Sequence, residues 1–462
     1  MSAREFPRQA PPISGSVATL CLTAFVVMVD TTVVQVMVPD LVRVAGGNLD
    51  YALWAVNGFV LTYAALLITA GRLGGLRGPK VLLLAGLVVF ALASLACGLS
   101  SSAAQLIAAR LAQGIGGALI VPQSLTIIAT VFPKERRGVA LGVISATMAL
   151  AAIIGPVGGG LIVSAWGWRW AFLVNVPTCL VALVLTLLWV PDAPAGPRQA
   201  LDWPGVALAT AGLAAITYAL IGKSEFGMVF AVAGVLLLML FVWWERRHRA
   251  PLMPTALFRQ RSFSLAGWLA CTQFLVLSGL MLVVSLHVRG PLGGSAIDTA
   301  LAFLPMAVTA GLVSPFAGAI TDRAGGRLVI STGLLAMGVG VAGFAVLAAA
   351  SAPLGLLALP LGVVGFGVGL VMAPASVEAV RYLPPSLVPA ASGVLNTGRQ
   401  VAGLLGVAIT GALLQTGPSG QAPAGVALGL LAGVALVAAA SGLLLRARPA
   451  QPDVLPATSV TS

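Results

Sequence analysis

The chain has 462 residues, of which 59% are hydrophobic and only 8% are charged. A soluble domain carries about 25% charged residues, so this composition excludes a soluble globular protein and indicates a polytopic, all-α membrane protein. The net charge of +12 would suggest nucleic acid as a partner of a soluble protein, but in a membrane protein it reports topology, so no nucleic-acid binding is expected.

Apolar runs of about 17 to 25 residues predict membrane-spanning helices. Six such runs lie near residues 16–38, 52–71, 81–100, 104–128, 138–162 and 170–190. Two more lie near 204–222 and 227–244, and a second set of six lies near 265–287, 299–320, 328–348, 354–374, 391–413 and 424–445. The first run is too long for the apolar part of a cleaved signal peptide, so it is expected to be a permanent helix.

These runs predict fourteen spans, arranged as two six-helix bundles with two additional helices between them. No soluble segment is long enough to fold as a separate domain. The expected organisation is a cytoplasmic tail (1–15), an N-terminal bundle (16–190), a linker with the two extra helices (191–244), a basic cytoplasmic loop (245–264), a C-terminal bundle (265–445) and a second cytoplasmic tail (446–462).

The distribution of Lys and Arg predicts the orientation of the chain. Of the 25 such residues, two lie inside predicted helices, and only Arg43, Arg169, Lys223 and Arg289 fall in loops on one side of the membrane. All the others fall on the side that carries both termini. Because cytoplasmic loops are enriched in Lys and Arg, both termini are expected to be cytoplasmic.

Two ionisable residues, Asp30 and Arg110, lie deep inside predicted spans. A charge at the bilayer centre costs roughly 2.5 to 3.5 kcal/mol on insertion scales, and charges that persist there commonly face a polar cavity and handle ions or substrates. Asp30 is therefore a candidate for proton binding. The alternative is that each group is a satisfied packing element, and the sequence does not decide whether the two side chains meet.

Other polar residues within the spans are candidates to line a substrate cavity. They are Gln35, Asn57, Gln123, Asn175, Gln273, Asn396 and Arg399. Each uncharged group has an alternative role as a hydrogen-bonding link between helices, and Arg399 has an alternative position with its charged end at the membrane surface.

An internal repeat relates the two halves. The segment Gly71–Lys80, between the second and third spans, matches Gly318–Arg327 in the second half, so that Gly78 aligns with Gly325 and Lys80 with Arg327. Such repeats are how many transporters build two bundles around a central site. The fifth span carries closely spaced small residues, which favour close helix packing, and these include Gly142, Gly155, Pro156 and Gly159.

The duplicated loop, the glycine-rich fifth span and four further motifs resemble the major facilitator superfamily, and in particular its fourteen-helix drug and proton antiporter branch. The four motifs are Met28–Pro39, Arg110–Gly114, Trp168–Pro177 and Asn396–Gln400. In the first loop copy, Gly75 and Leu76 replace the Asp-Arg pair that the family carries. The resemblance extends over residues from about 16 to 445.

The resemblance implies two pseudo-symmetric bundles that rock about a central site, with proton coupling at Asp30 and Arg110. It also assigns conformational roles to the loop motifs and to the fifth span. The residues concerned are Gly71, Arg77, Gly78, Lys80, Gly142, Gly155, Pro156, Gly159, Asp322, Arg323, Gly325 and Arg327.

The expected function is proton-driven efflux of hydrophobic or amphipathic drugs, including antibiotics, across a bacterial cytoplasmic membrane. The expected partners are the lipid bilayer, small-molecule substrates and protons, and the protein is expected to be a monomer without catalytic residues, metal or cofactor. The alternatives are a dedicated exporter of one metabolite, antibiotic or siderophore, and a non-transporting membrane sensor.

Overall fold

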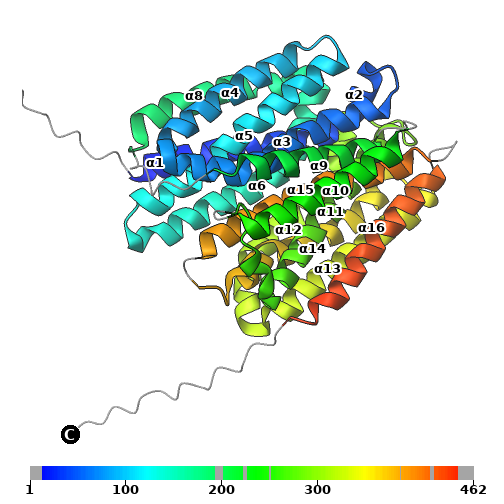
Figure 1. Ribbon diagram of the computed structural model, residues 1–462. Helices are drawn as coiled ribbons and strands as arrows, with labels where there is room; N and C mark the ends of the chain where they lie inside the picture. The colour runs from blue at the N-terminus through cyan, green and yellow to red at the C-terminus, as the bar shows by residue number, and fades with distance from the viewer. Residues whose placement is uncertain are drawn as a thin grey trace, which may run out of the picture.

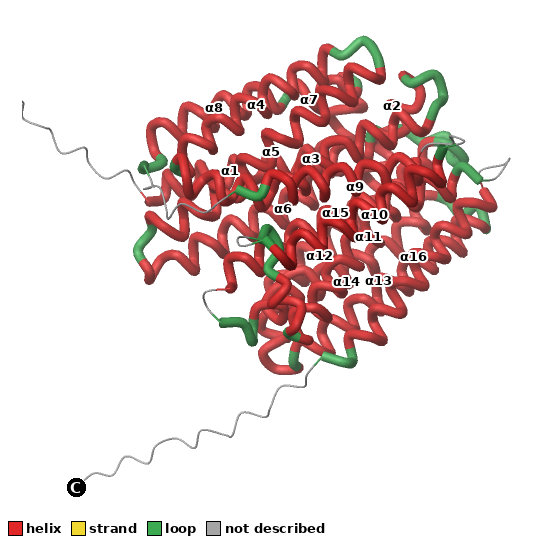
Figure 2. The backbone as a smooth tube through the Cα atoms, viewed as in Figure 1, coloured by secondary structure: helices red, strands yellow, loops and turns green. Residues whose placement is uncertain are grey.

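The structure, a computed structural model, is all-helical over the residues it describes, which are 13–192, 201–221, 226–248, 251–384, 387–416 and 421–445 (Figures 1 and 2). The first half comprises α1 (Ile13–Val36), α2 (Val38–Val44), α3 (Leu49–Arg77), α4 (Pro79–Leu99), α5 (Ala103–Val131), α6 (Lys134–Trp166), α7 (Trp168–Leu173) and α8 (Asn175–Trp189). The remainder comprises α9 (Trp203–Ile221), α10 (Gly227–Arg247), the 3₁₀ helix η1 (Thr255–Arg259), α11 (Arg261–Arg289), α12 (Ala296–Ala324), α13 (Gly326–Ala349), α14 (Leu354–Val380), α15 (Val388–Leu414) and α16 (Gln421–Gly442).

Every predicted span corresponds to a helical segment. Thirteen helices among the described residues are long and apolar enough to cross a membrane. The fifth predicted span is α6, which has 33 residues and whose side chains are described only in part. The prediction of an all-α membrane protein is therefore confirmed.

Two predicted spans are interrupted where the sequence places a proline. The first ends as α1, and the short helix α2 begins after Met37 with Pro39 in its first turn. The sixth is divided into α7 and α8 around Val174, with Pro177 in the first turn of α8. Proline has no amide hydrogen for the preceding turn, so it is tolerated in the first turn of a helix, where Pro39 and Pro177 both lie.

The two extra helices lie along the junction of the two halves. Helices α9 and α10 pack against each other, and α9 also contacts α3 of the first half and α15 of the second (Figure 1). The two halves meet directly through α6 with α12 and through α3 with α15. Helix α9 therefore bridges the halves from one side, and α10 packs on α9.

The two matched loops adopt the same backbone turn. Gly78 has φ +89° and ψ 131°, and Gly325 has φ +82° and ψ 144°. Each glycine amide donates to the carbonyl four residues earlier, on Gly74 and Thr321, at 3.0 and 2.9 Å. A side chain would be strained at such positive φ values, so the repeat preserves the residue that the turn requires.

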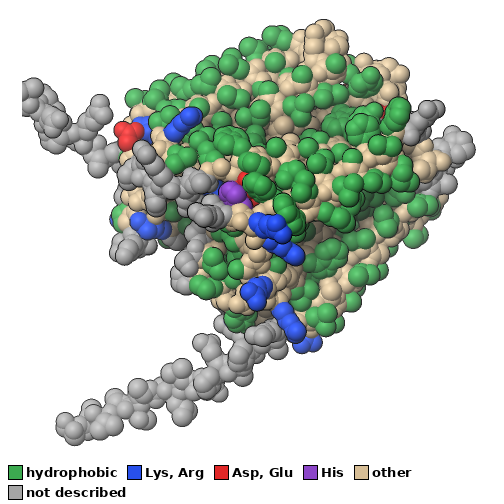
Figure 3. All heavy atoms as spheres, viewed as in Figure 1, with side chains coloured by type: hydrophobic (Ala, Val, Ile, Leu, Met, Phe, Trp, Pro, Cys, Tyr) green, Lys and Arg blue, Asp and Glu red, His purple; other side chains and the backbone are tan. Residues whose placement is uncertain are grey.

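The outer surface suits a bilayer. Hydrophobic side chains cover most of the face shown in Figure 3, and Lys and Arg gather at the end where α1 begins and α16 ends. Exposed apolar residues such as Leu188, Met228 and Leu312 would contact lipid chains. We refer to this Lys- and Arg-rich end as the terminal end, and to the other as the α2 end.

Candidate functional site

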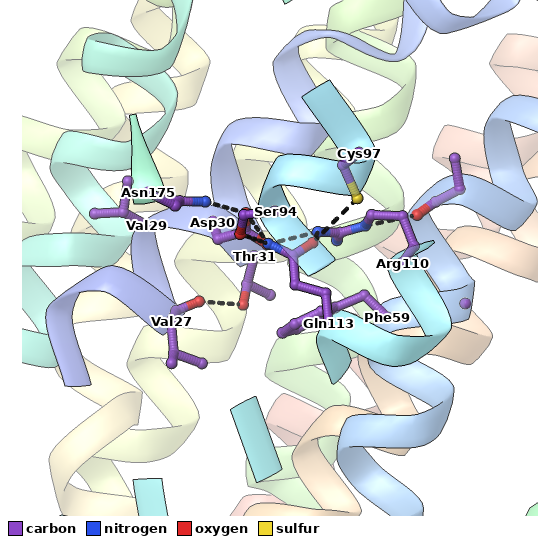
Figure 4. Close-up of polar contacts among 12 residues, drawn as sticks. Val27, Val29, Asp30, Thr31, Phe59, Ser94, Cys97, Arg110, Gln113 and Asn175 are labelled. Atoms are coloured by element: carbon purple, nitrogen blue, oxygen red, sulfur yellow. Dashed lines mark hydrogen bonds and ion pairs between the residues drawn. The ribbon is translucent and has the colours of Figure 1, made fainter. Parts of the chain in front are cut away.

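Asp30 and Arg110 form a buried ion pair inside the first half of the molecule (Figure 4). Asp30 lies in the second half of α1, six residues before its end at Val36, and Arg110 lies near the start of α5, which begins at Ala103. The Arg110 Nη1 atom donates to Asp30 Oδ2 at 2.6 Å, and the two residues are 2% and 1% exposed. The two buried charges that the sequence identifies are therefore direct partners.

Two amide side chains complete the coordination of the Asp30 carboxylate. Gln113 Nε2 and Asn175 Nδ2 both donate to Asp30 Oδ1, at 2.9 and 2.7 Å. Gln113 also donates to Ser94 Oγ at 2.8 Å and accepts from Arg110 Nη1 at 2.6 Å. The carboxylate thus faces three donors from α5 and α8, and Gln113 links it to α4.

The guanidinium of Arg110 is enclosed as fully as its partner. Its Nε atom donates to the carbonyl of Ala55 on α3 at 3.0 Å. Its Cζ atom lies 4.5 Å from the ring centroid of Phe59 and 5.5 Å from that of Phe172. Aromatic faces stabilise a cation from which water is excluded, so the charge is held by the ion pair, the carbonyl and two rings together.

A small cavity of about 10 Å³, enough for about one water molecule, reaches Ala55 from the α2 end. It is lined also by Leu41, Leu106 and Trp168. This cavity approaches Arg110 through the carbonyl that accepts its Nε hydrogen bond.

Close helix approach positions these partners. A Cβ atom on Gly114 of α5 would collide with the Phe59 carbonyl and the Thr62 hydroxyl of α3. On α6, a Cβ atom on Gly155 would collide with the Thr32 hydroxyl of α1, two residues after Asp30. Glycine removes both collisions and lets the helix backbones approach.

The other small residues of α6 differ in their surroundings. A Cβ atom on Gly159 would lie 2.7 Å from Val33 of α1, and Pro156 is buried within the uninterrupted helix. Gly142, in contrast, is exposed, and a Cβ atom there would meet no atom within 4 Å. The contact with α1 therefore belongs to the second half of α6.

Four other uncharged candidates, Gln35, Asn57, Gln123 and Gln273, are buried and are not among the hydrogen-bond partners described for Asp30. Gln123 Nε2 donates to the carbonyl of Ala70 at 2.7 Å, and Gln273 Nε2 donates to that of Val368 at 3.1 Å. Gln35 Oε1 and both polar atoms of Asn57 are buried with no hydrogen-bond partner within the described part of the chain.

Arg399 and Asn396 line a groove between α14 and α15 near the terminal end. Arg399 Nη2 donates to the Met372 carbonyl at 3.0 Å and to Ser376 Oγ at 2.8 Å. Its guanidinium also lies 5.6 Å from the Phe274 ring centroid. The structure thus places Arg399 inside the second half, separate from the Asp30 network.

The first loop copy is tied by Lys80 to the segment that follows α8. Lys80 Nζ lies 3.2 Å from Asp192, and Arg77 is exposed. A Cβ atom added to Gly71 would lie at an ordinary contact distance from Pro122. In the second copy, Arg327 Nε is buried and has no hydrogen-bond acceptor among the residues that the structure describes. The side chains of Asp322 and Arg323 lie outside the described part of the structure.

Two further buried acidic residues, Glu245 and Asp202, lie near the linker helices. Glu245 anchors the segment after α10, which contacts Arg72 of the first loop copy. Glu245 accepts hydrogen bonds from the amides of Leu252 and Met253 at 3.2 and 2.6 Å, and Arg72 of α3 donates to the Pro251 carbonyl. The predicted basic loop is therefore held in place partly by a buried carboxylate at its start.

Asp202, just before α9, belongs to the same junction. It accepts from the Gly205 amide and from the Trp244 indole, both at 2.9 Å. Burial acts to raise the pKa of Asp202, but these hydrogen bonds outweigh it and lower the pKa below its ordinary value. The extra helices are thus joined to each other at the terminal end.

An ion pair that the sequence does not reveal joins the two halves at the α2 end. Arg289 at the end of α11 contacts Asp40 of α2 through two hydrogen bonds of 2.6 and 3.1 Å. Close packing continues around it, because Gly160 of α6 and Gly411 of α15 meet Ala296 and Leu53 of the opposite half. These contacts close the α2 end between the halves.

Comparison with known proteins gives consistent matches over most of the chain. A family model described as Major Facilitator Superfamily matches residues 20–407 and, in a second match, residues 266–461. An uncharacterized MFS-type transporter of Mycobacterium tuberculosis is 37% identical over 408 residues, covering 87% of this chain and 70% of its own length. The multidrug resistance protein Stp of the same species is 32% identical over 400 residues, with coverage of 85% and 74%. The methylenomycin A resistance protein of Streptomyces coelicolor is 33% identical over 415 residues, with coverage of 87% and 86%.

Proposed function

Because this chain belongs to the Major Facilitator Superfamily, we propose that it exports hydrophobic or amphipathic drugs or antibiotics in exchange for protons by alternating access. Two similar proteins carry names that state multidrug or antibiotic resistance. The single observation that carries the proton coupling is the Asp30–Arg110 ion pair. Placing a carboxylate inside a bilayer costs free energy, and the carboxylates that are found there commonly handle ions or substrates.

In the proposed cycle, Asp30 binds a proton from one side and releases it to the other. Protonation removes the negative charge that faces Arg110, so the guanidinium must find another acceptor, and Gln113 already accepts from the same Nη1 atom. The change in the ion pair would alter the packing of α1 against α5. Since α1 packs on α6, and α6 contacts α12 of the second half, this provides a route from proton binding to movement of the halves.

The orientation in the membrane is part of the proposal. The terminal end would face the bacterial cytoplasm, and the α2 end would face outward, with the protein acting as a monomer in the lipid bilayer. The conformation is then closed to the outside by Asp40 and Arg289. Substrate would enter from the cytoplasmic side in this state and leave after the outer contacts separate.

Everted membrane vesicles test the export function. Vesicles containing the protein should accumulate antibiotics or dyes from a panel when a pH gradient is imposed, and a protonophore should abolish the accumulation. Accumulation of a single compound would identify a dedicated exporter. Passive equilibration of every compound, unaffected by the protonophore, would contradict proton-driven export.

Breaking the Asp40–Arg289 pair is expected to open the outer end. Asp40→Asn leaves a buried guanidinium without its charge partner, so the closed state should lose stability relative to the open one. The reaction of a Leu53→Cys variant with an impermeant thiol reagent added outside whole cells should then accelerate about tenfold, which corresponds to 1.4 kcal/mol.

The control for this experiment is the reversed pair, Asp40→Arg with Arg289→Asp, which should slow the thiol reaction again. The protein with Leu53 retained gives the background from the four native cysteines. Equal reaction rates with and without Asp40→Asn would show that the pair does not hold the outer end closed.

A further inference from the structure

We propose that Arg399 and its groove form a recognition site for the oxyanion of an acidic amphipathic substrate, an inference that rests on the proposed export function. The groove lies between α14 and α15 and has a volume of about 260 Å³. Its polar lining comes from Arg399, Ser376, Ser392 and Asn396. These groups offer hydrogen-bond donors, as an oxyanion requires.

Arg399 carries a buried charge that no described carboxylate neutralises. The residue is 7% exposed, and both hydrogen bonds of its Nη2 atom go to neutral acceptors. Its Nε atom is buried and has no acceptor within the described part of the chain. Glu378, two residues beyond Ser376 on α14, is already paired with Arg381 at 2.6 Å. Since an uncompensated buried ion costs several kcal/mol, a ligand with a negative charge would stabilise this site.

The contrast with Arg110 supports a ligand-binding role. Both arginines are buried within spans, yet Arg110 has Asp30 as its partner, whereas Arg399 lines a groove and has no acidic partner among the described residues. The guanidinium fork binds carboxylate, phosphate or sulfonate oxygens through two parallel hydrogen bonds. The first half would then handle the proton, and the second half would recognise the charge of the substrate.

The size and position of the groove limit what it binds. Pockets for whole drug-sized molecules span about 300 to 1,000 Å³, so this groove accommodates an acidic group and the carbons next to it. Val377 and Leu395 provide the apolar surface for those carbons. The groove lies near the terminal end, opposite the Asp40–Arg289 closure, so the ligand would arrive from the proposed cytoplasmic side. An anionic lipid headgroup offers the same oxyanion chemistry there.

The test compares rhodamine B with its ethyl ester, two dyes that differ only in whether the carboxylate is free. Binding of each to the full chain in nanodiscs of zwitterionic lipid is followed by fluorescence anisotropy. The wild type should bind the acid at least about tenfold more tightly than the ester. Arg399→Gln should remove this preference by weakening binding of the acid alone, because only the acid offers a carboxylate to the guanidinium. The tenfold difference corresponds to about one charge-assisted hydrogen-bonded contact.

Three further measurements make the result specific. Arg399→Lys keeps the charge without the fork and should give an intermediate preference. Arg246→Gln removes an exposed positive charge at the same end and should leave both affinities unchanged. The third measurement repeats the titration with anionic phosphatidylglycerol in the nanodiscs, and binding of the acid should persist.

Three outcomes would overturn the proposal. The first is that the wild type binds the two dyes with equal affinity or binds neither. The second is that Arg399→Gln weakens the binding of both dyes equally. The third is that binding of the acid is lost when anionic lipid is present, which would identify a lipid headgroup as the occupant. Because binding is measured without a pH gradient, these outcomes leave the vesicle test of proton-driven export independent.

Discussion

Replacing Asp30 with Asn is expected to abolish the accumulation of substrate that a pH gradient drives, while passive substrate exchange continues. Asparagine keeps the size of the side chain but cannot exchange a proton near physiological pH. Exchange needs only movement of the two halves, whereas accumulation needs the coupled proton. Uptake by everted vesicles and counterflow of labelled substrate, both at matched expression, separate these two activities.

The contacts of Asp30 indicate that Asp30→Asn should be compared with a double variant in which Arg110 is replaced as well. Three donors face the carboxylate, so the asparagine NH₂ group would meet another donor, and Arg110 would lose its charge partner. Removing one member of a buried pair costs about 3–5 kcal/mol. The double variant Asp30→Asn with Arg110→Gln removes both charges and should restore stability without restoring coupling. If either variant accumulated substrate as the wild type does, Asp30 would not be the coupling group.

Gly155→Leu is expected to reduce transport at least tenfold while leaving membrane insertion intact. The new side chain would collide with Thr32 of α1, and overpacking a close helix contact costs about 1–3 kcal/mol or more. The displacement would move α1 next to Asp30, so transport should suffer even though leucine suits lipid. The measurement is the initial uptake rate divided by the amount of inserted protein.

Gly142→Leu provides the matched control for Gly155→Leu. It introduces the same side chain into the same helix, at a position where a Cβ atom meets nothing within 4 Å. Its transport rate should stay close to that of the wild type. Equal losses in both variants would point to a general effect of leucine on α6, and normal transport by Gly155→Leu would show that its contact with α1 is not needed.

The helices were predictable because the signal for a membrane span is local. The length and apolarity of each run fix the helix, and a proline lies in the first turn after each of the breaks that divide the first and sixth spans. The glycine of the repeated loop was predictable in the same way, since Gly78 and Gly325 both occupy a turn that requires a positive φ. The domain boundaries and the cytoplasmic location of the termini stay predictions.

The candidate site was only partly predictable, because its contacts join residues far apart in the chain. Burial of charge identifies Asp30 and Arg110 separately, but their contact across 80 residues depends on helix packing. Gln113 had a local signal, since it lies three residues after Arg110 on the same face of α5. Asp40 and Arg289 are separated by 249 residues and lie at helix ends, where charged residues are ordinary, so no local pattern marks their pairing.

Glu245 shows how average composition can hide a specific contact. The segment it begins is rich in Arg, and this indicates a basic, solvated connector. In the structure, the Glu245 side chain is buried and accepts two backbone amides of that segment. Its role follows from the fold of residues 251–253 around it, which the hydrophobic pattern does not describe.

Simultaneous measurement of proton and substrate flux in proteoliposomes tests the central claim most directly. With a substrate identified from the vesicle panel, the purified wild-type protein should move protons in the direction opposite to the substrate, and uphill substrate movement should stop when the pH gradient is removed. The Asp30→Asn, Arg110→Gln double variant should exchange substrate without moving protons. Uphill transport by the wild type without proton flux, or proton-coupled transport by the double variant, would contradict proton coupling through Asp30.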